Sequence, residues 1–342
     1  MRKWLQLTMV FLVTVAGVTL GAPSRDASAA PQTWRGFFLF DSAAASINAA
    51  GFNDFVRINL QDDKCNPWGS GPFPSQIEPY LRNPVWHVLI NSGGKSCGYD
   101  YQKIRSLIEQ PFPRDPLGKS WSTLFRAYPD VEFILEIGNE PSFFWPQADA
   151  WTQRWWMIAV YDELARNAYG HIDQPWRQKY PNLAWAVAVG VPLNYTQIHL
   201  TYLSGEGSVL VTTTGQKRYD YVTIHRYSDG DVRSITPDWQ GTWDYVINQR
   251  SDITKVLLTE FGIHCASCVS PGSNRVNAYR WWINTQTPAK VKGVLVYICS
   301  TLYFSCNPQD PNFIFDYQVK TSELAAIVGD HWGTAWNGLS CD

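Results

Sequence analysis

Two glutamates in this chain follow apolar runs, where their carboxyl groups could act together on a bound molecule. Residues 133–141 (FILEIGNEP) are apolar at first and then present Asn139 and Glu140, and the next residue, a proline, cannot continue a sheet ladder. Residues 256–262 (VLLTEFG) present Glu260 in a similar position. A protonated carboxyl group can donate to the leaving oxygen of a glycosidic bond while an ionised one attacks the anomeric carbon.

The same two side chains could instead form separate salt bridges at the protein surface. The chemistry requires that they face one another, and mutual repulsion then raises the pKa of whichever carboxyl group is the acid. A separation of about 5–5.5 Å is typical of hydrolysis with retention of anomeric configuration, and about 6.5–9.5 Å of inversion. The elements that carry Glu140 and Glu260 therefore decide between these interpretations.

Eight apolar runs have the length of β-strands. Several are nearly continuous in Val, Ile, Leu and Phe, which is typical of strands covered on both faces. Roughly fifteen to forty residues separate them, enough for the crossovers that parallel strands need. The runs are Trp34–Phe40, Phe55–Leu60, Trp86–Asn91, Val131–Glu140, Leu183–Val191, Tyr221–Tyr227, Lys255–Gly262 and Lys292–Ser300.

Helical spacing of apolar residues appears between several of these runs. It predicts helices over Tyr101–Gln110, Trp151–Tyr169 and Asn274–Asn284, and a shorter one over Ser42–Ala50. Strands that alternate with helices eight times indicate an α/β fold, a closed (β/α)₈ barrel, formed as a single domain by residues 30–342. The fourth and seventh strands lie across such a barrel from each other, and reactive side chains collect at the carboxyl ends of the strands.

The two glutamate motifs resemble the signatures of a known enzyme clan. Residues 138–141 (GNEP) and 259–262 (TEFG) resemble the acid/base and nucleophile motifs of clan A glycoside hydrolases. Family 5, which holds many cellulases and mannanases, is the most similar, and family 39 is a plausible neighbour. The resemblance implies a retaining hydrolase of β-glucan or β-mannan, with Glu140 as acid/base, Glu260 as nucleophile and Asn139 on the sugar 2-hydroxyl.

Further residues match the same pattern. Arg57 lies inside the apolar second run, where a buried cation must be paired, in an ordinary ion pair or, as the resemblance implies, with the nucleophile. His225 and Tyr227 are two residues apart and share a strand face. The resemblance implies that this tyrosine donates to the nucleophile and this histidine contacts substrate. Glu136 shares the parity of Glu140 and is expected to pair with a basic group inside the barrel.

Two positions depart from the family 5 pattern. Asn91 ends the third run where the family usually carries a histidine, and Tyr297 takes the place of the usual tryptophan of the eighth strand. Both are expected to contact substrate. The chain also has 17 tryptophans, which could fill the core or stack on sugar rings. Loop aromatics are candidate sugar-stacking walls, with loop packing as the alternative; they are Trp145, Trp68, Phe143 and Phe144.

The amino-terminal residues 1–29 have the features of a secretory signal peptide: two basic residues, an apolar stretch and small residues before a cleavage site after Ala29. A retained membrane anchor is the alternative, but threonines and a glycine dilute the stretch. We expect a secreted bacterial protein, extracellular or periplasmic, with no membrane partner after cleavage.

Seven cysteines fit an oxidising compartment, and an odd number leaves at least one outside any internal disulfide. Cys65–Cys97 and Cys299–Cys306 are the expected pairs. Cys265 and Cys268 have the spacing of half a zinc site, but no second pair completes one, and a structural disulfide or free thiols are favoured.

The remaining composition excludes some function classes. A formal net charge of −2 gives no electrostatic reason for a nucleic-acid partner. The histidines form no metal-hydrolase motif, and no serine lies in a G-x-S-x-G elbow. We expect a monomer without metal or cofactor that acts on a polysaccharide or oligosaccharide. The main rival is a non-catalytic carbohydrate-binding barrel, which would typically have lost one of the two carboxylates.

Overall fold

The computed structural model divides the chain into two units, residues 1–32 and 33–342. The structure describes parts of the second unit: residues 33–39, 55–60, 72–82, 85–93, 96–113, 115–139, 150–189, 208–212, 214–229, 232–264 and 275–299. The expected signal peptide and the expected helix over Ser42–Ala50 lie outside the described residues. So do the predicted disulfides, because no cysteine side chain is described.

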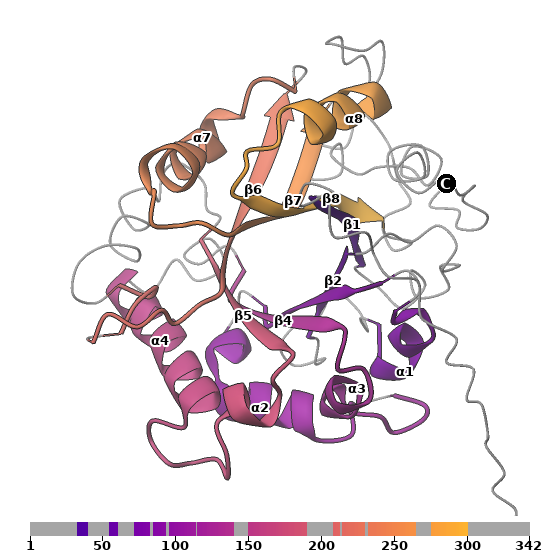
Figure 1. Ribbon diagram of the computed structural model, residues 1–342, viewed down its shortest axis with the longest axis vertical. Helices are drawn as coiled ribbons and strands as arrows, with labels where there is room; N and C mark the ends of the chain where they lie inside the picture. The colour runs from indigo at the N-terminus through magenta and orange to yellow at the C-terminus, as the bar shows by residue number, and fades with distance from the viewer. Residues whose placement is uncertain are drawn as a thin grey trace, which may run out of the picture. The chain divides into compact units, whose positions relative to one another are not determined.

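The described residues form eight parallel strands that pair in chain order and close into a barrel, with β8 pairing β1 (Figure 1). This confirms the predicted (β/α)₈ class, and each strand overlaps one of the predicted runs. The strands are β1 Trp34–Leu39, β2 Phe55–Asn59, β3 His87–Asn91, β4 Glu132–Ile137, β5 Leu183–Ala188, β6 Tyr221–Asp229, β7 Val256–His264 and β8 Val291–Cys299.

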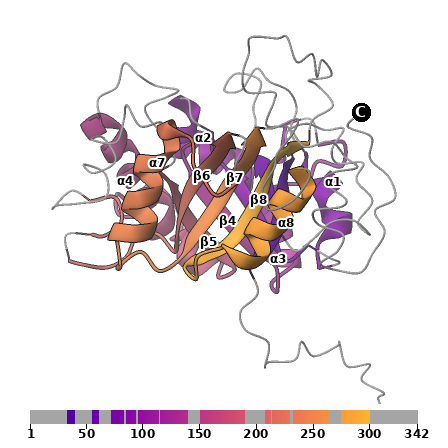
Figure 2. The same ribbon diagram turned by 90° about the horizontal axis from the view of Figure 1, so that it is seen from above.

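Helices lie outside this ring of strands (Figures 1 and 2). Three of the predicted helices are confirmed, as α2, α4 and α8, and each predicted boundary is within three residues of the observed one. The helices are α1 Pro74–Ile77, α2 Tyr101–Glu109, α3 Trp121–Ala127, α4 Ala150–Arg166, α5 Trp176–Lys179, α7 Pro237–Trp243, which runs into a π-helical turn over Asp244–Gln249, and α8 Arg275–Thr285.

The barrel interior contains a cluster of buried side chains to which seven strands contribute. Its members are Phe55, Leu89, Ile134, Ala186, Tyr221, Leu257 and Leu295. Gly293 leaves room for the ring of Phe55, since a Cβ there would lie 2.7 Å from that ring. This packed cluster fills the barrel below the polar residues at the carboxyl ends of the strands, so the barrel interior is a core and not a pore.

Several tryptophans belong to a second hydrophobic core, which lies outside the barrel between the strands and the helices. Trp121, Trp176 and Trp185 are fully buried there, so for these three the core interpretation is correct and the sugar-stacking one is not. Among the described helices, none combines the length and the apolar composition needed to cross a membrane.

Glu109 at the end of α2 connects this helix to α5. Its Oε1 accepts from Lys179 Nζ at 2.6 Å and Tyr180 Oη at 2.9 Å, and its Oε2 accepts from Arg105 Nε at 3.1 Å. Partial burial raises the pKa of Glu109, but the hydrogen bonds from these three donors outweigh it and leave the pKa below the usual value. The ionised carboxylate therefore stabilises the folded state.

Glu109→Gln is expected to lower the free energy of unfolding by about 1 kcal/mol at pH 7. A depressed folded-state pKa contributes stability above the unfolded value of about 4.3, and that stability is lost as pH falls through the folded-state pKa. The deficit should therefore shrink at pH 3. Urea unfolding at both pH values measures it, with Asp130→Asn as control because Asp130 forms an exposed ion pair with Arg82. Equal effects of the two substitutions would contradict the assignment.

Candidate active site

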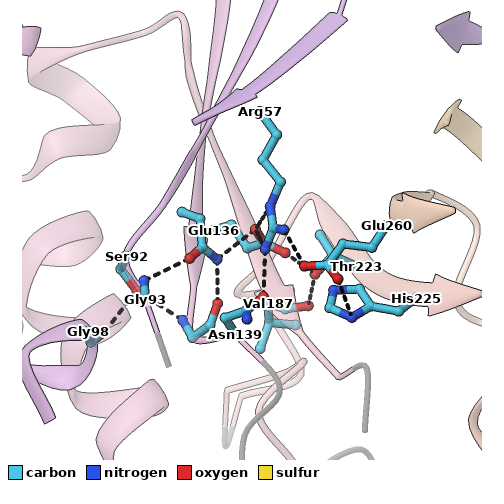
Figure 3. Close-up of polar contacts among 12 residues, drawn as sticks. Arg57, Ser92, Gly93, Gly98, Glu136, Asn139, Val187, Thr223, His225 and Glu260 are labelled. Atoms are coloured by element: carbon cyan, nitrogen blue, oxygen red, sulfur yellow. Dashed lines mark hydrogen bonds and ion pairs between the residues drawn. The ribbon is translucent and has the colours of Figure 1, made fainter. Parts of the chain in front are cut away.

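Polar side chains from four strands converge at the carboxyl ends of the barrel strands (Figure 3). Arg57 comes from β2, Glu136 from β4, His225 from β6 and Glu260 from β7, and Asn139 lies two residues after the end of β4. Of the predicted site residues, the structure brings together Arg57, Asn91, Asn139, His225, Tyr227 and Glu260. Glu140 and Trp145 lie outside the described residues, as does the side chain of Tyr297.

Arg57 is the centre of this cluster and is completely buried. Its Nε donates to Glu136 Oε2 at 2.9 Å, its Nη1 to Glu260 Oε1 at 2.7 Å and its Nη2 to Asn139 Oδ1 at 2.7 Å. Burial lowers the pKa of Arg57, but the two carboxylates outweigh burial and raise it. The guanidinium therefore stays charged and fixes three other side chains in one plane of donors.

Glu260 is 5% exposed and has both carboxylate oxygens engaged. Oε1 accepts from Arg57, while Oε2 accepts a hydrogen bond from Tyr227 Oη and lies 3.5 Å from His225 Nδ1. Burial raises the pKa of Glu260, but the charges of His225 and Arg57 and the hydrogen bonds from Tyr227 and Arg57 prevail and lower it. Near neutral pH this carboxyl group is thus an ionised, oriented and largely dehydrated base or nucleophile.

A β-bulge in β7 turns Glu260 toward the barrel interior. The pairing of β6 with β7 passes from Ile224↔Leu258 directly to His225↔Glu260, so Thr259 has no partner residue in β6. In an unbroken strand with Leu257 inside, alternation would place Thr259 inside and Glu260 outside. The extra residue restores Glu260 to the interior face, a known use of bulges beside functional sites.

Asn91 and Gly138 shape the end of β4 below Asn139. Asn91 Nδ2 donates to Glu136 Oε2 and to the Gly138 carbonyl, both at 2.7 Å, and its Oδ1 accepts from Gly93 N at 2.9 Å. Gly138 has φ +83°, where a Cβ would lie 3.0 Å from Met157 Cε, so glycine is required. Asn91 is 1% exposed and its amide is committed to protein groups; its predicted contact with substrate stays a prediction.

Trp239 of α7 supports the two β6 side chains that face Glu260. Its ring centroid lies 5.2 Å from that of His225 and 5.4 Å from that of Tyr227, and it is 8% exposed. Trp239 could not be predicted from the sequence, because α7 has only seven residues and gives little periodic signal. Thr223 was not predicted either; it donates to Glu136 from the strand face shared with His225.

Tyr227→Phe tests how Glu260 is kept ionised. Loss of the phenolic donor removes one interaction that lowers the pKa of Glu260, so the pKa should rise, by about one unit. A ¹³C NMR titration of the side-chain carboxyl carbon measures it, with the Glu260 signal assigned from Glu260→Gln. Tyr219→Phe is a matched control, because Tyr219 Oη donates to a backbone carbonyl away from the cluster. An unchanged or lower midpoint in Tyr227→Phe would be the contrary result.

No group of three or more histidine, cysteine or acidic side chains suited to a metal ion occurs within the described part of the chain. What the described cluster offers is a carboxylate in a low-dielectric setting, held from one side by a guanidinium and from another by a phenol. Such a group can attack an electrophilic carbon or remove a proton.

No protein-family model and no curated protein matches the chain. Among solved structures it is similar to a glucosidase from Croceicoccus marinus, with 14% identity, 88% of this chain and 68% of that chain covered and a TM-score of 0.45. It is also similar to the exo-beta-1,4-mannosidase Op5Man5 from Opitutaceae bacterium strain TAV5, with 13% identity, 80% and 53% covered and a TM-score of 0.45.

A third similar structure is the hyperthermostable endo-1,4-beta-D-mannanase from Thermotoga petrophila RKU-1. The identity is 12%, the alignment covers 72% of this chain and 90% of that chain, and the TM-score is 0.34. This chain spans about half the length of the Opitutaceae mannosidase. All three proteins are glycoside hydrolases by name, and at these identities the likeness is one of fold.

Proposed function

We propose that the chain is a retaining glycoside hydrolase in which Glu260 is the nucleophile and Glu140 the acid/base. The observation that supports this is the state of Glu260, a buried carboxylate at the carboxyl end of β7 whose pKa is kept low by His225, Arg57 and Tyr227. A nucleophilic carboxylate must be unprotonated, aimed at one point and free of a tight shell of water.

In the first step, Glu260 attacks the anomeric carbon and forms a covalent glycosyl ester. The bond from that carbon to the leaving oxygen breaks, and the leaving oxygen takes the proton of Glu140. In the second step, Glu140, now ionised, removes a proton from water as the water oxygen attacks the anomeric carbon. The bond to Glu260 breaks, and both carboxyl groups return to their starting states with the configuration retained.

The surrounding residues have separate tasks in this scheme. Arg57 and Tyr227 each donate a hydrogen bond to one oxygen of Glu260. These bonds restrict rotation of the carboxylate and orient it for attack on the sugar. Asn139 uses its Oδ1 to accept from Arg57, which leaves its Nδ2 hydrogens to donate to the sugar 2-hydroxyl. His225 supports Glu260 from the adjacent strand, at 3.5 Å.

The proposed substrate is a β-linked glucan or mannan outside the cytoplasm. This follows from the likeness of the GNEP and TEFG motifs to family 5 of clan A and from the features of residues 1–29. The proposed hydrolysis needs no metal ion or cofactor, since the two carboxyl groups supply the whole reaction.

A panel of β-glucans, β-mannans and aryl β-glycosides tests the proposal, with ¹H NMR to follow the anomer released first. Wild type should release the β-anomer from a β-linked substrate, and Glu260→Gln should release none. Glu132→Gln is the matched control, because Glu132 lies at the opposite end of β4, where it contacts His87 and Tyr221. Turnover by Glu260→Gln at the wild-type rate, or no turnover by the wild type, would overturn it.

A further inference from the structure

Glu136 is a completely buried carboxylate that the proposed reaction does not use. Its Oε2 accepts from Arg57 Nε at 2.9 Å and from Asn91 Nδ2 at 2.7 Å, and its Oε1 accepts from the hydroxyl of Thr223. Arg57 Nη2 also lies 2.9 Å from Oε2. Three strands beside β4 or across the barrel thus direct side-chain donors at this one group (Figure 3).

The donors around Glu136 favour a carboxylate over a neutral carboxyl group. Arginine has no acceptor, and the orientation of the Asn91 amide is fixed because its Oδ1 accepts from Gly93 N. A proton on Oε2 would therefore point at N–H groups. Hydrogen bonds from several donors of this kind favour the charged form of a buried carboxylate. Two carboxylates, Glu136 and Glu260, consequently share the one guanidinium of Arg57.

This stoichiometry decides how strongly Arg57 restrains the nucleophile. Alone with Arg57, Glu260 would form a neutral pair and lose basicity and nucleophilic strength. With Glu136 on the other side of the guanidinium, the three groups together carry a net charge of −1, which attracts the positive charge that develops on the sugar in the transition state. Building on the function proposed above, we propose that Glu136 is a positioning residue that keeps Glu260 reactive by sharing Arg57 with it.

The charged and titratable groups that face Glu136 and Glu260 affect the titration of Glu260. Among the described residues, Glu260 faces Arg57 from β2 and His225 and Tyr227 from β6. Among the same described residues, the charged group that Glu136 faces is Arg57. A change at Glu136 therefore reaches Glu260 through Arg57, while the contacts of Glu260 with β6 are left in place.

Glu136→Gln removes the charge and keeps the shape. The new amide oxygen can accept from Arg57 and Asn91, and the hydroxyl of Thr223 can turn from donor to acceptor for the new NH₂ group. Glu136→Asp keeps the charge and shortens the side chain. Near-UV circular dichroism establishes that both variants are folded, and the carboxyl ¹³C titration of Glu260 is read in the two variants and in wild type, without substrate.

We expect the titration midpoint of Glu260 to fall by about one pH unit in Glu136→Gln and to stay within a few tenths of a unit in Glu136→Asp. The acid limb of kcat/KM should shift in the same direction, and kcat at the plateau should fall about tenfold in Glu136→Gln. A residue that only supports the fold would lower activity or stability in both variants and leave the midpoint unmoved. That result, or a midpoint that rises in Glu136→Gln, would overturn the inference.

The two proposals fail separately in this design. Wild type that titrates as expected but cleaves no glycoside would overturn the hydrolase and leave the charge sharing intact. If wild type cleaves glycosides but the titration midpoint of Glu260 is the same in Glu136→Gln as in wild type, the charge sharing is overturned and the hydrolase proposal stands.

Discussion

Glu260→Ala should reduce glycoside turnover on the order of 10⁴-fold or more, because the substitution removes the proposed nucleophile, which Arg57 and Tyr227 orient. Sodium azide should restore part of the activity toward a dinitrophenyl β-glycoside. The small anion fits the volume left by the carboxylate and attacks from the same face, so the product should be the α-glycosyl azide. An activated leaving group is used because it needs no proton from Glu140.

The identity of the azide product separates the roles of the two glutamates. An acid/base variant with an intact nucleophile would give the β-glycosyl azide, since azide then replaces water in the second step. Glu140→Ala is therefore the matched comparison, assayed with the same substrate. Rescue of Glu260→Ala to the β-azide, or full activity without azide, would contradict the assignment of Glu260.

Arg57→Met is expected to have the largest effect on stability, a loss of about 3–5 kcal/mol at pH 7. Methionine fills much of the same volume but leaves Glu136 and Glu260 buried without their guanidinium. The pKa of Glu260 then rises, because burial is opposed only by His225 and Tyr227 and no longer by Arg57. Because protonation removes the uncompensated charge, the deficit should be greatest at neutral pH and should shrink below about pH 4.

Chemical unfolding of wild type and Arg57→Met at pH 7 and pH 3.5 measures this. Arg82→Met is the matched control, because Arg82 is paired with Asp130 on the exposed surface, at 3.2 Å, and its removal should cost less than about 1 kcal/mol. Losses for Arg57→Met and Arg82→Met that are similar in size, or that do not depend on pH, would show that the buried cluster does not hold its charges as described.

The barrel could be predicted from sequence because parallel strands that are covered on both faces consist of nearly continuous apolar residues. Each of the eight predicted runs overlaps an observed strand, and helix α2 has a clear periodic pattern of apolar residues. Short helices could not be predicted. Helix α3 has only seven residues and depends on the cap provided by Ser120, whose Oγ accepts from Thr123 N, a local contact without periodicity.

At the site, the strand ends together with the resemblance to clan A were sufficient to predict Arg57, His225, Tyr227 and Glu260 as neighbours. The orientation of Glu260 could not be obtained in this way, since it depends on the bulge at Thr259. The only sequence signal is the odd spacing between the interior Leu257 and Glu260, which also fits an outward side chain.

Other contacts at the site depend on three-dimensional packing alone. Trp239 reaches His225 and Tyr227 from a short helix, so nothing in its local sequence distinguishes it from the other tryptophans. The predicted contact of Asn91 with substrate stays a prediction. The contacts of its amide with Glu136 and the Gly138 carbonyl could not be predicted, because they depend on the register of β3 with β4.

Trapping the covalent intermediate tests the central claim most directly. Incubation with 2,4-dinitrophenyl 2-deoxy-2-fluoro-β-glucoside or the corresponding mannoside slows the second step, so the sugar should stay on the enzyme with release of one equivalent of dinitrophenol. Peptide mass spectrometry should find the fluorosugar on Glu260, and the Glu260→Gln protein should acquire none. A fluorosugar on any other residue, or hydrolysis of both glycosides without a labelled protein, would contradict the account.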